Sequence, residues 1–355
     1  MILIPLYSPN YLAAAIAATL PVALYISSII VKREYCMPIS CVFIVTECFI
    51  NSMRRGGGDL IHYVDAAYSG FTFWEPLYGL IGVIGNFLLP NSPEALLSTC
   101  LFLVSALFYI PFLFLTDQSR SIMKYLAFSA LFFGPSLPET QLRLCTSISF
   151  GWISYILIAR GSTIPSFLFA LASLTSHSLG LLILPLILFS NKLTFFSLVK
   201  LINSFKVNWK TLSVVMSITL ILTVLASSLL SSRYQSLNVM DVNAVASSSF
   251  IKNLIMTGIC LALLNLRTKP DFKAEAKPKI NSHDFPSGQL SINNVLQILI
   301  PFGWLSRLRF ILYTSFTAII CDNHSKTILT LVIVALSARN LYLYFAIDQS
   351  CLLFT

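Results

Sequence analysis

The sequence predicts an all-α polytopic membrane protein, with about ten or eleven transmembrane or re-entrant helices of the length a bilayer needs. Hydrophobic residues make up 56% of the 355 residues, and only 10% of the residues are charged. The mean hydropathy is +0.81. These values lie outside the range of soluble globular domains. We therefore treat residues 1–355 as a single integral membrane domain.

The individual helices are predicted from apolar windows, since a spanning helix needs roughly 20 predominantly apolar residues. Windows of this length lie at 11–31, 94–115, 141–160, 211–230 and 326–346. Shorter or interrupted windows lie at 37–52, 73–90, 123–135, 249–266, 292–303 and 310–321. The window at 73–90 has glycines at three-residue spacing, which favours a re-entrant or surface helix. Residues 163–190 join two cytoplasmic loops, which predicts a short hairpin with His177 near its tip.

Orientation is predicted from the places where Lys and Arg gather, because these residues favour the cytoplasmic side. The segments 191–210 and 267–291 are rich in lysine, so we expect both to be cytoplasmic basic loops. Residues 231–248 then form an external loop, and 53–72 form an external site loop. The net charge of +9 fits such loops beside anionic lipid, and no nucleic-acid partner is expected.

Several ionisable residues gather on the predicted external side, near membrane depth, where a charge is costly and usually functional. They are Arg54, Arg55, Asp59, Glu139, Arg143, His177, Arg233, Arg307 and Arg309. A guanidinium group can donate two parallel hydrogen bonds to the oxygens of one phosphate, so a set of several arginines suits a pyrophosphate. For any single arginine, an interfacial anchor or an internal salt bridge is the alternative interpretation.

Candidate acid–base groups lie in three places along the chain. Asp59 follows a run of three glycines that lets the backbone approach an anion. His177 lies deep in an apolar run, where it is either a general base or a core histidine satisfied by hydrogen bonds. Glu139 could act as the base or pair with Arg143. Tyr63 suits either an aromatic belt at the interface or sugar stacking.

The absence of some well-known motifs argues against several classes of chemistry. The chain has no HExxH, DxD, P-loop or GxSxG pattern, so zinc proteolysis, metal-dependent nucleotide-sugar transfer and ester hydrolysis have no support. Its eight cysteines show no ligand spacing and lie in or beside apolar runs. We expect them to be small core residues, not metal ligands or disulfides.

The order of these features resembles the EpsG/Wzy family of membrane polysaccharide polymerases, over roughly residues 50–310 on a matching hydropathy profile. The elements that carry the resemblance are Arg54/Arg55, Gly57-Gly58-Asp59, Tyr63, Glu75-Pro76-Leu77-Tyr78, Arg143, Ser176-His177 and Arg233-Tyr234. The resemblance implies a GT-C-like glycosyltransferase architecture in a bacterial inner membrane, with the active site facing the periplasm.

The resemblance also implies a reaction. Undecaprenyl-pyrophosphate-linked oligosaccharide repeat units serve as both donor and acceptor and are joined into O-antigen or exopolysaccharide. A hydroxyl of the acceptor attacks the anomeric carbon of the donor, and undecaprenyl pyrophosphate leaves. The resemblance implies no cofactor, neither nucleotide nor metal, and a separate chain-length regulator as partner.

Site residues follow from the same resemblance. It assigns the pyrophosphate to Arg143 and Arg233, assisted by Arg54 or Arg55. The base is Asp59, His177 or Glu139. The resemblance assigns further substrate contacts to Tyr63, Glu75 and Tyr234. Arg307 is added to them as one of the arginines near membrane depth on the external side. Two other functions remain open: a ligase that moves a lipid-linked glycan to another carrier, and a transporter or flippase of such glycans. A transporter is disfavoured because no internal repeat is visible and the charges map to one face.

Overall fold

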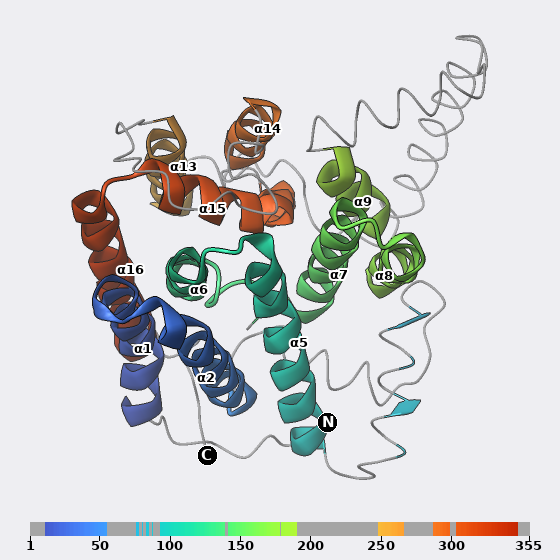
Figure 1. Ribbon diagram of the computed structural model, residues 1–355, viewed down its shortest axis with the longest axis horizontal. Coiled ribbons are helices and arrows are strands. Elements are labelled where there is room, and N and C mark those ends of the chain that lie inside the picture. The colour runs from blue at the N-terminus through green and yellow to red at the C-terminus, as the bar shows by residue number, and fades with distance from the viewer. Residues whose placement is uncertain are drawn as a thin grey trace. The chain divides into compact units, whose positions relative to one another are not determined.

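The computed structural model describes residues 11–54, 76–77, 80, 83–84, 87, 93–138, 141–177, 179–189, 248–265, 287–298 and 303–346. Throughout these residues the regular secondary structure is helical, as the sequence predicts (Figure 1). The chain divides into two compact units. The first comprises Met1–Ile187, Leu264–Phe285 and Phe310–Thr355, and the second comprises Leu188–Leu263 and Pro286–Arg309.

Within the described residues, five helices are long and apolar enough to cross a membrane: Tyr11–Ile30, Arg33–Ser52, Ala95–Leu115, Leu142–Ala159 and Lys326–Tyr344. Four of them match the long apolar windows of the sequence, which confirms the membrane class. The fifth helix, Arg33–Ser52, corrects the prediction at 37–52. The apolar window at 37–52 is shorter than a membrane span, but the helix extends beyond it towards the N-terminus. The helix begins at Arg33, because charged residues at its first turn are compatible with a span that starts at the membrane surface. The window at 211–230 lies outside the described residues.

Helices α1 (Tyr11–Ile30), α2 (Arg33–Ser52) and α16 (Lys326–Ala346) pack together in the first unit (Figure 1). A row of alanines on α1 allows close approach, and this row shares a buried cluster with Ile50 and Tyr344. The Ser337 hydroxyl donates to the Ala18 carbonyl over 2.8 Å. The Tyr25 hydroxyl donates to the Lys326 carbonyl over 3.0 Å. These pairs make α1 and α16 antiparallel, so α16 runs in the same direction as α2.

Helices α5 (Pro93–Leu115), α6 (Ser119–Phe132) and α15 (Tyr313–Asn323) form an aromatic core. The rings of Phe108 and Tyr313 stack with their centroids 4.8 Å apart, and the Tyr313 hydroxyl donates to the Phe108 carbonyl over 2.9 Å. Between α6 and the end of α15, the Tyr125 hydroxyl donates to the Asp322 carboxylate over 2.6 Å. The hydroxyls of these two buried tyrosines therefore have acceptors, as burial in an apolar environment favours.

Helix α7 (Leu142–Ala159) packs against α8 (Thr163–Ser176) through small residues, and α9 (Gly180–Phe189) follows. A Cβ atom on Gly151 of α7 would lie 2.8 Å from the Ile187 side chain. A Cβ atom on Gly180, at the start of α9, would lie 2.7 Å from the Ser173 carbonyl oxygen. Helix α9 therefore turns back along α7. Helix α8 ends at Ser176 and α9 begins at Gly180. The helix break at His177 agrees with the tip of the predicted hairpin, whereas the loop at 191–210 that the hairpin would lead to lies outside the described residues.

Three further described helices lie wholly or mostly in the second unit. These are α13 (Ser248–Asn265), α14 (Ser287–Ile298) and the 3₁₀ helix η2 (Gly303–Leu312). Helix α13 coincides with the apolar window at 249–266, whereas α14 begins five residues before the window at 292–303. The predicted loops 191–210 and 231–248 lie outside the described residues, apart from Ser248. The predicted loop 267–291 is too long at its C-terminal end, because residues 287–291 already belong to α14, and its remainder lies outside the described residues.

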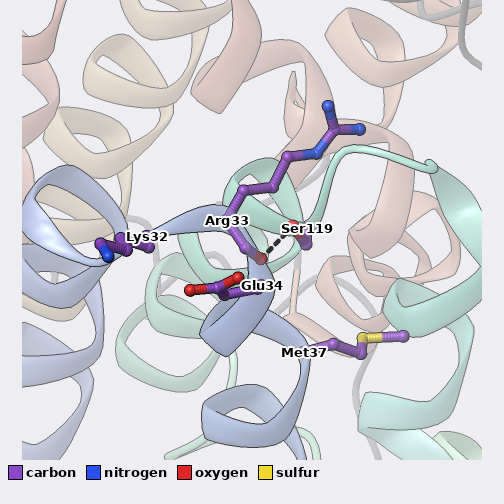
Figure 2. A pocket seen from close by; sticks show the side chains of 5 residues that line it. All are labelled: Lys32, Arg33, Glu34, Met37 and Ser119. Atoms are coloured by element: carbon purple, nitrogen blue, oxygen red, sulfur yellow. Dashed lines mark hydrogen bonds between the residues drawn. The ribbon is translucent and has the colours of Figure 1, made fainter.

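One end of the first unit carries several exposed cations. At one end, Ser119 and Arg120 donate to the Arg33 and Val31 carbonyls over 3.3 and 3.2 Å. The Arg160 guanidinium donates to the Phe114 carbonyl over 2.9 Å at the same end. We call this the Lys32 end, because Lys32, Arg33, Arg120 and Arg160 are all exposed there. It carries a shallow surface depression lined by Lys32, Arg33, Glu34, Met37 and Ser119 (Figure 2).

The opposite end of this unit, which we call the Arg143 end, is reached by the C-terminus of α2 and the N-termini of α5 and α7. Helices α2 and α5 are antiparallel, since Phe49 packs against Phe102 and Phe43 against Tyr109. The chain therefore leaves α2 and enters α5 at the same end. A connecting segment that is re-entrant or lies on the membrane surface must begin and end on the same side of the membrane, so it requires α2 to end where α5 begins. The residues 73–90 themselves lie largely outside the described part of the chain.

Candidate functional site

Four of the predicted site residues are described: Arg54, Arg143, His177 and Arg307. The other predicted site residues lie outside the described part of the chain, namely Arg55, Asp59, Tyr63, Glu75, Glu139, Arg233 and Tyr234. The candidate site is therefore built from the described residues and from the helices that hold them.

Arg143 lies in the first turn of α7, at the Arg143 end, and is half-buried. The residue before the helix, Gln141, makes no side-chain cap to the first turn. Its carbonyl accepts the first intrahelical bond, from Cys145 N–H, over 2.8 Å. The first amides of a helix carry a partial positive charge, so Arg143 adds a full charge where the backbone is already positive. This combination favours an anion.

His177 ends α8 and is 8% exposed. Its backbone leaves the helical region, with φ −153° and ψ 143°. Its Nδ1 atom accepts a hydrogen bond from the Leu179 N–H over 3.0 Å, and its carbonyl accepts the Gly180 N–H over 2.8 Å. The side chain and the carbonyl together satisfy amides that begin α9, in the way an N-cap residue does.

The bond to Nδ1 decides which ring nitrogen of His177 carries a proton. A nitrogen that accepts a hydrogen bond has no proton, so the neutral ring carries its proton on Nε2. In this geometry the neutral ring of His177 can donate a hydrogen bond only through Nε2. Accepting a proton at Nδ1 would break the bond that caps α9. The described geometry therefore supports a donor role for His177 more than the role of general base.

Arg143 and His177 are brought to the same level by the packing of α7 on α8. Two pairs of serines face each other across the helices: Ser147 with Ser173, and Ser154 with Ser166. Both pairs belong to one antiparallel register, because the steps along the two helices are equal and opposite. Continuing this register to the end of α8 brings Ser176, and His177 directly after it, to about the level of Arg143 in the first turn of α7.

Arg54 lies at the same end of the unit but is bound to another helix. It is 3% exposed, at the C-terminus of α2. Its guanidinium donates to the Tyr344 hydroxyl over 3.3 Å, and its Cζ lies 5.5 Å from the centre of the Tyr344 ring. These contacts join α2 to α16, whereas Arg143 and His177 lie on α7 and at the α8–α9 break. Arg307 is exposed on η2 and belongs to the second unit.

Sequence reasoning missed Glu47, which is 4% exposed in α2. It lies one turn before Asn51 and two turns before Arg54, on one buried face of the helix. Asn51 donates to the Ser105 hydroxyl of α5 over 3.1 Å on this face. The available signal was an acidic residue inside the apolar window at 37–52, since ionisable residues within spans are rare and usually functional.

A second missed feature is the pair Arg339 and Asn340 on α16. Both donate to the Leu131 carbonyl at the end of α6, over 2.9 and 3.0 Å. The last carbonyls of a helix have no intrahelical donor, so this pair caps α6 from a neighbouring helix. Residues 133–141, which lead to Arg143, begin at this capped end. The signal was again a charged residue within an apolar window.

The cysteines behave as small core residues in most places. Seven cysteines are described and form no disulfide: Cys41 is exposed, and the buried ones are Cys36, Cys48, Cys100, Cys145, Cys260 and Cys321. Among the residues that the structure describes, no group of three or more His, Cys, Asp or Glu side chains is arranged to hold a metal ion.

Comparison with known proteins adds no family assignment. No family model matches the chain, and neither a curated protein nor a solved structure matches it.

Proposed function

We propose that this protein is a membrane glycan polymerase that joins lipid-linked oligosaccharide repeat units outside the cytoplasm of a bacterial cell. The observation that carries the proposal is that Arg143 and His177 occupy one level at the end of the unit opposite the exposed cations. A guanidinium and a neutral imidazole donor suit the two phosphates of a lipid pyrophosphate. The order of sequence features, which resembles EpsG/Wzy polymerases, supplies the reaction.

The exposed cations at the Lys32 end support an orientation in the membrane. Exposed Lys and Arg residues near the ends of spans favour the cytoplasmic side of a membrane. The Lys32 end has this character. Under the proposal, the Lys32 end faces the cytoplasm and the Arg143 end faces the periplasm. Lipid-linked repeat units would then meet Arg143 and His177 on the outer side of the inner membrane.

The proposed reaction forms a bond between an acceptor hydroxyl oxygen and the anomeric carbon of the donor glycan. The bond from that carbon to the pyrophosphate oxygen breaks, and undecaprenyl pyrophosphate leaves with the electron pair. Arg143, with Arg233 and with Arg54 or Arg55, stabilises the charge that develops on the leaving group. The hydroxyl proton passes to a carboxylate, for which Asp59 and Glu139 remain the candidates.

The experiment is turnover of a purified lipid-linked repeat unit by the purified protein, with products separated by length on a gel. The proposal predicts a ladder of lengthened lipid-linked glycans that persists in EDTA. Transfer of the glycan to an added lipid acceptor, without a ladder, would instead indicate a ligase. Movement of intact substrate across a proteoliposome bilayer, with no new glycosidic bond, would indicate a transporter.

A further inference from the structure

We propose that the Lys32 end binds the phosphodiester group of an anionic phospholipid, in the depression where α2 and α6 begin, with Lys32 and Arg33 as the cations. The depression is lined by Lys32, Arg33, Glu34, Met37 and Ser119 (Figure 2). The inference requires only that the protein lies in a membrane, and it is independent of the proposed glycan chemistry. It assigns a ligand to an end of the protein that the proposed reaction does not use.

The turn between α1 and α2 is held against the first turn of α6. The Ser119 hydroxyl donates to the Arg33 carbonyl over 3.3 Å, and the Arg120 guanidinium donates to the Val31 carbonyl over 3.2 Å. Both bonds use the backbone of the turn as acceptor. The turn is therefore fixed in place while the side chains of Lys32 and Arg33 stay available to a ligand.

The charge of this surface suits an anion. The exposed cations are Lys32, Arg33 and Arg120, and the exposed acids near them in the sequence are Glu34 and Asp117. Among the described residues, neither Lys32 nor Arg33 forms an ion pair. Figure 2 shows the Arg33 guanidinium pointing away from the Glu34 carboxylate. The surface therefore has an excess of one positive charge, which the single negative charge of a phosphodiester balances.

Exposed apolar side chains adjoin these cations. Ile30 precedes them and is 74% exposed, and Tyr35 and Met37 follow in the first two turns of α2. In a bilayer such side chains face acyl chains, whereas the longer cationic side chains reach the level of the head groups. A soluble phosphate would use only the cations, but a phospholipid matches both parts of the surface. Basic pockets between membrane helices recognise lipid head groups in this way.

Glu34 distinguishes an anionic head group from a zwitterionic one. Its exposed carboxylate lines the depression. The ammonium group of phosphatidylethanolamine would pair with this carboxylate. Phosphatidylglycerol brings no positive charge, so Glu34 only repels its phosphodiester. Glu34→Gln should therefore tighten the binding of phosphatidylglycerol, and it should weaken binding if the ligand is phosphatidylethanolamine.

The test measures lipid binding by the purified full-length protein in detergent. The probe is dioleoylphosphatidylglycerol, with the matching phosphatidylcholine and phosphatidylethanolamine as comparison lipids, and native mass spectrometry gives the dissociation constants. Glycerophosphoglycerol is the competitor, since it offers the same phosphodiester without acyl chains. Lys32→Gln and Arg33→Gln remove the two cations, alone and together. Lys326→Gln and Arg160→Gln are the matched controls, because these residues are exposed but do not line the depression.

The proposal predicts that wild type binds phosphatidylglycerol about tenfold or more tightly than phosphatidylcholine. Lys32→Gln and Arg33→Gln should each weaken this binding by about fivefold and the double variant by about twentyfold, because each basic residue beside an anionic lipid adds a similar attraction. The two controls should stay within about twofold of wild type. Both substituted side chains are exposed, so thermal unfolding should be unchanged and the loss of binding reports lost contacts to the lipid.

Three results would overturn the inference. Equal losses in the controls and in the Lys32 and Arg33 variants would show a diffuse attraction to the whole end. Displacement of the lipid by an equal concentration of glycerophosphoglycerol would assign the depression to a soluble phosphodiester. A preference for phosphatidylethanolamine that Glu34→Gln abolishes would assign it to a zwitterionic head group. The inference stands if only the lining cations support binding and Glu34→Gln tightens it.

Discussion

Ser147 and Ser173 exchange hydrogen bonds across α7 and α8. The Ser147 hydroxyl donates to the Ser173 carbonyl and the Ser173 hydroxyl donates to the Ser147 carbonyl, each over 2.7 Å. Ser154 and Ser166 repeat the exchange two turns away, with both distances 2.9 Å. Small residues let the two backbones approach closely in a membrane, where polar side chains replace water as bonding partners. This pairing sets the register that brings the end of α8, directly before His177, to about the level of Arg143.

Removing this exchange should weaken the helix pair by a modest, coupled amount. Ser147→Ala and Ser173→Ala should each reduce the free energy of unfolding by about 0.6 kcal/mol, the average for interhelical hydrogen bonds in membranes. A double-mutant cycle followed by denaturant titration in mixed micelles measures the coupling. Thr175→Ala is the control, since that hydroxyl donates to Leu171 in its own helix. A coupling energy of zero would show that the two serines do not support each other.

Gly180→Ala should distort the break between α8 and α9. The added Cβ would meet backbone atoms of Ser173 and Leu174, which cannot move aside as a flexible side chain can. We expect a loss of about 1–3 kcal/mol, as for overpacked cores. Gly258→Ala in α13 is the matched control, because no atom lies within 4 Å of its added Cβ. Thermal unfolding of the two variants in detergent gives the comparison, and equal stability would contradict the close approach.

Arg339→Gln should destabilise the protein by loosening the C-terminus of α6. The guanidinium donates to the Leu131 carbonyl and also contacts the Asn340 side chain over 3.0 Å. Loss of a charged hydrogen bond in a partly buried setting should cost about 1.5–3 kcal/mol. Arg160→Gln, whose guanidinium bonds an exposed carbonyl, should cost less. Equal losses in thermal unfolding would mean that the cap on α6 adds no special stability.

The orientation can be read by labelling single cysteines placed in a cysteine-free background. Met53 is 44% exposed beside Arg54 at the Arg143 end. Met53→Cys should react with a membrane-impermeant maleimide in cells whose outer membrane is permeabilised. Lys32→Cys should react only after the inner membrane is opened, because Lys and Arg at that end favour the cytoplasm. The reverse pattern would place Arg143 in the cytoplasm and contradict the proposed site.

Hydropathy predicts most of the first unit, because a span must be apolar over its whole length. The windows at 94–115 and 141–160 became α5 and α7 within a few residues. Hydropathy misjudged α2, since Arg33 and Glu34 interrupt the apolar pattern without interrupting the helix. The hairpin at His177 was predictable from topology, because residues 163–190 join two loops with cytoplasmic character.

Site chemistry was less predictable than the helices. The sequence places His177 among possible bases, but the tautomer depends on the Leu179 amide, which only the fold brings to Nδ1. Likewise, the level shared by Arg143 and His177 depends on serine pairs 26 and 12 residues apart. Composition alone cannot show that these serines meet. Asp59, Glu139 and Arg233 lie outside the described residues, so their roles stay predictions.

The most direct test of the central claim compares two arginines at opposite ends of α7. Wild type, Arg143→Ala and Arg160→Ala would be assayed for extension of a lipid-linked repeat unit at matched expression and stability. The account predicts that Arg143→Ala loses polymerisation by about a hundredfold or more, as when an electrostatic stabiliser of a leaving group is removed. Arg160→Ala should retain the full ladder. Full polymerisation by Arg143→Ala would contradict the account.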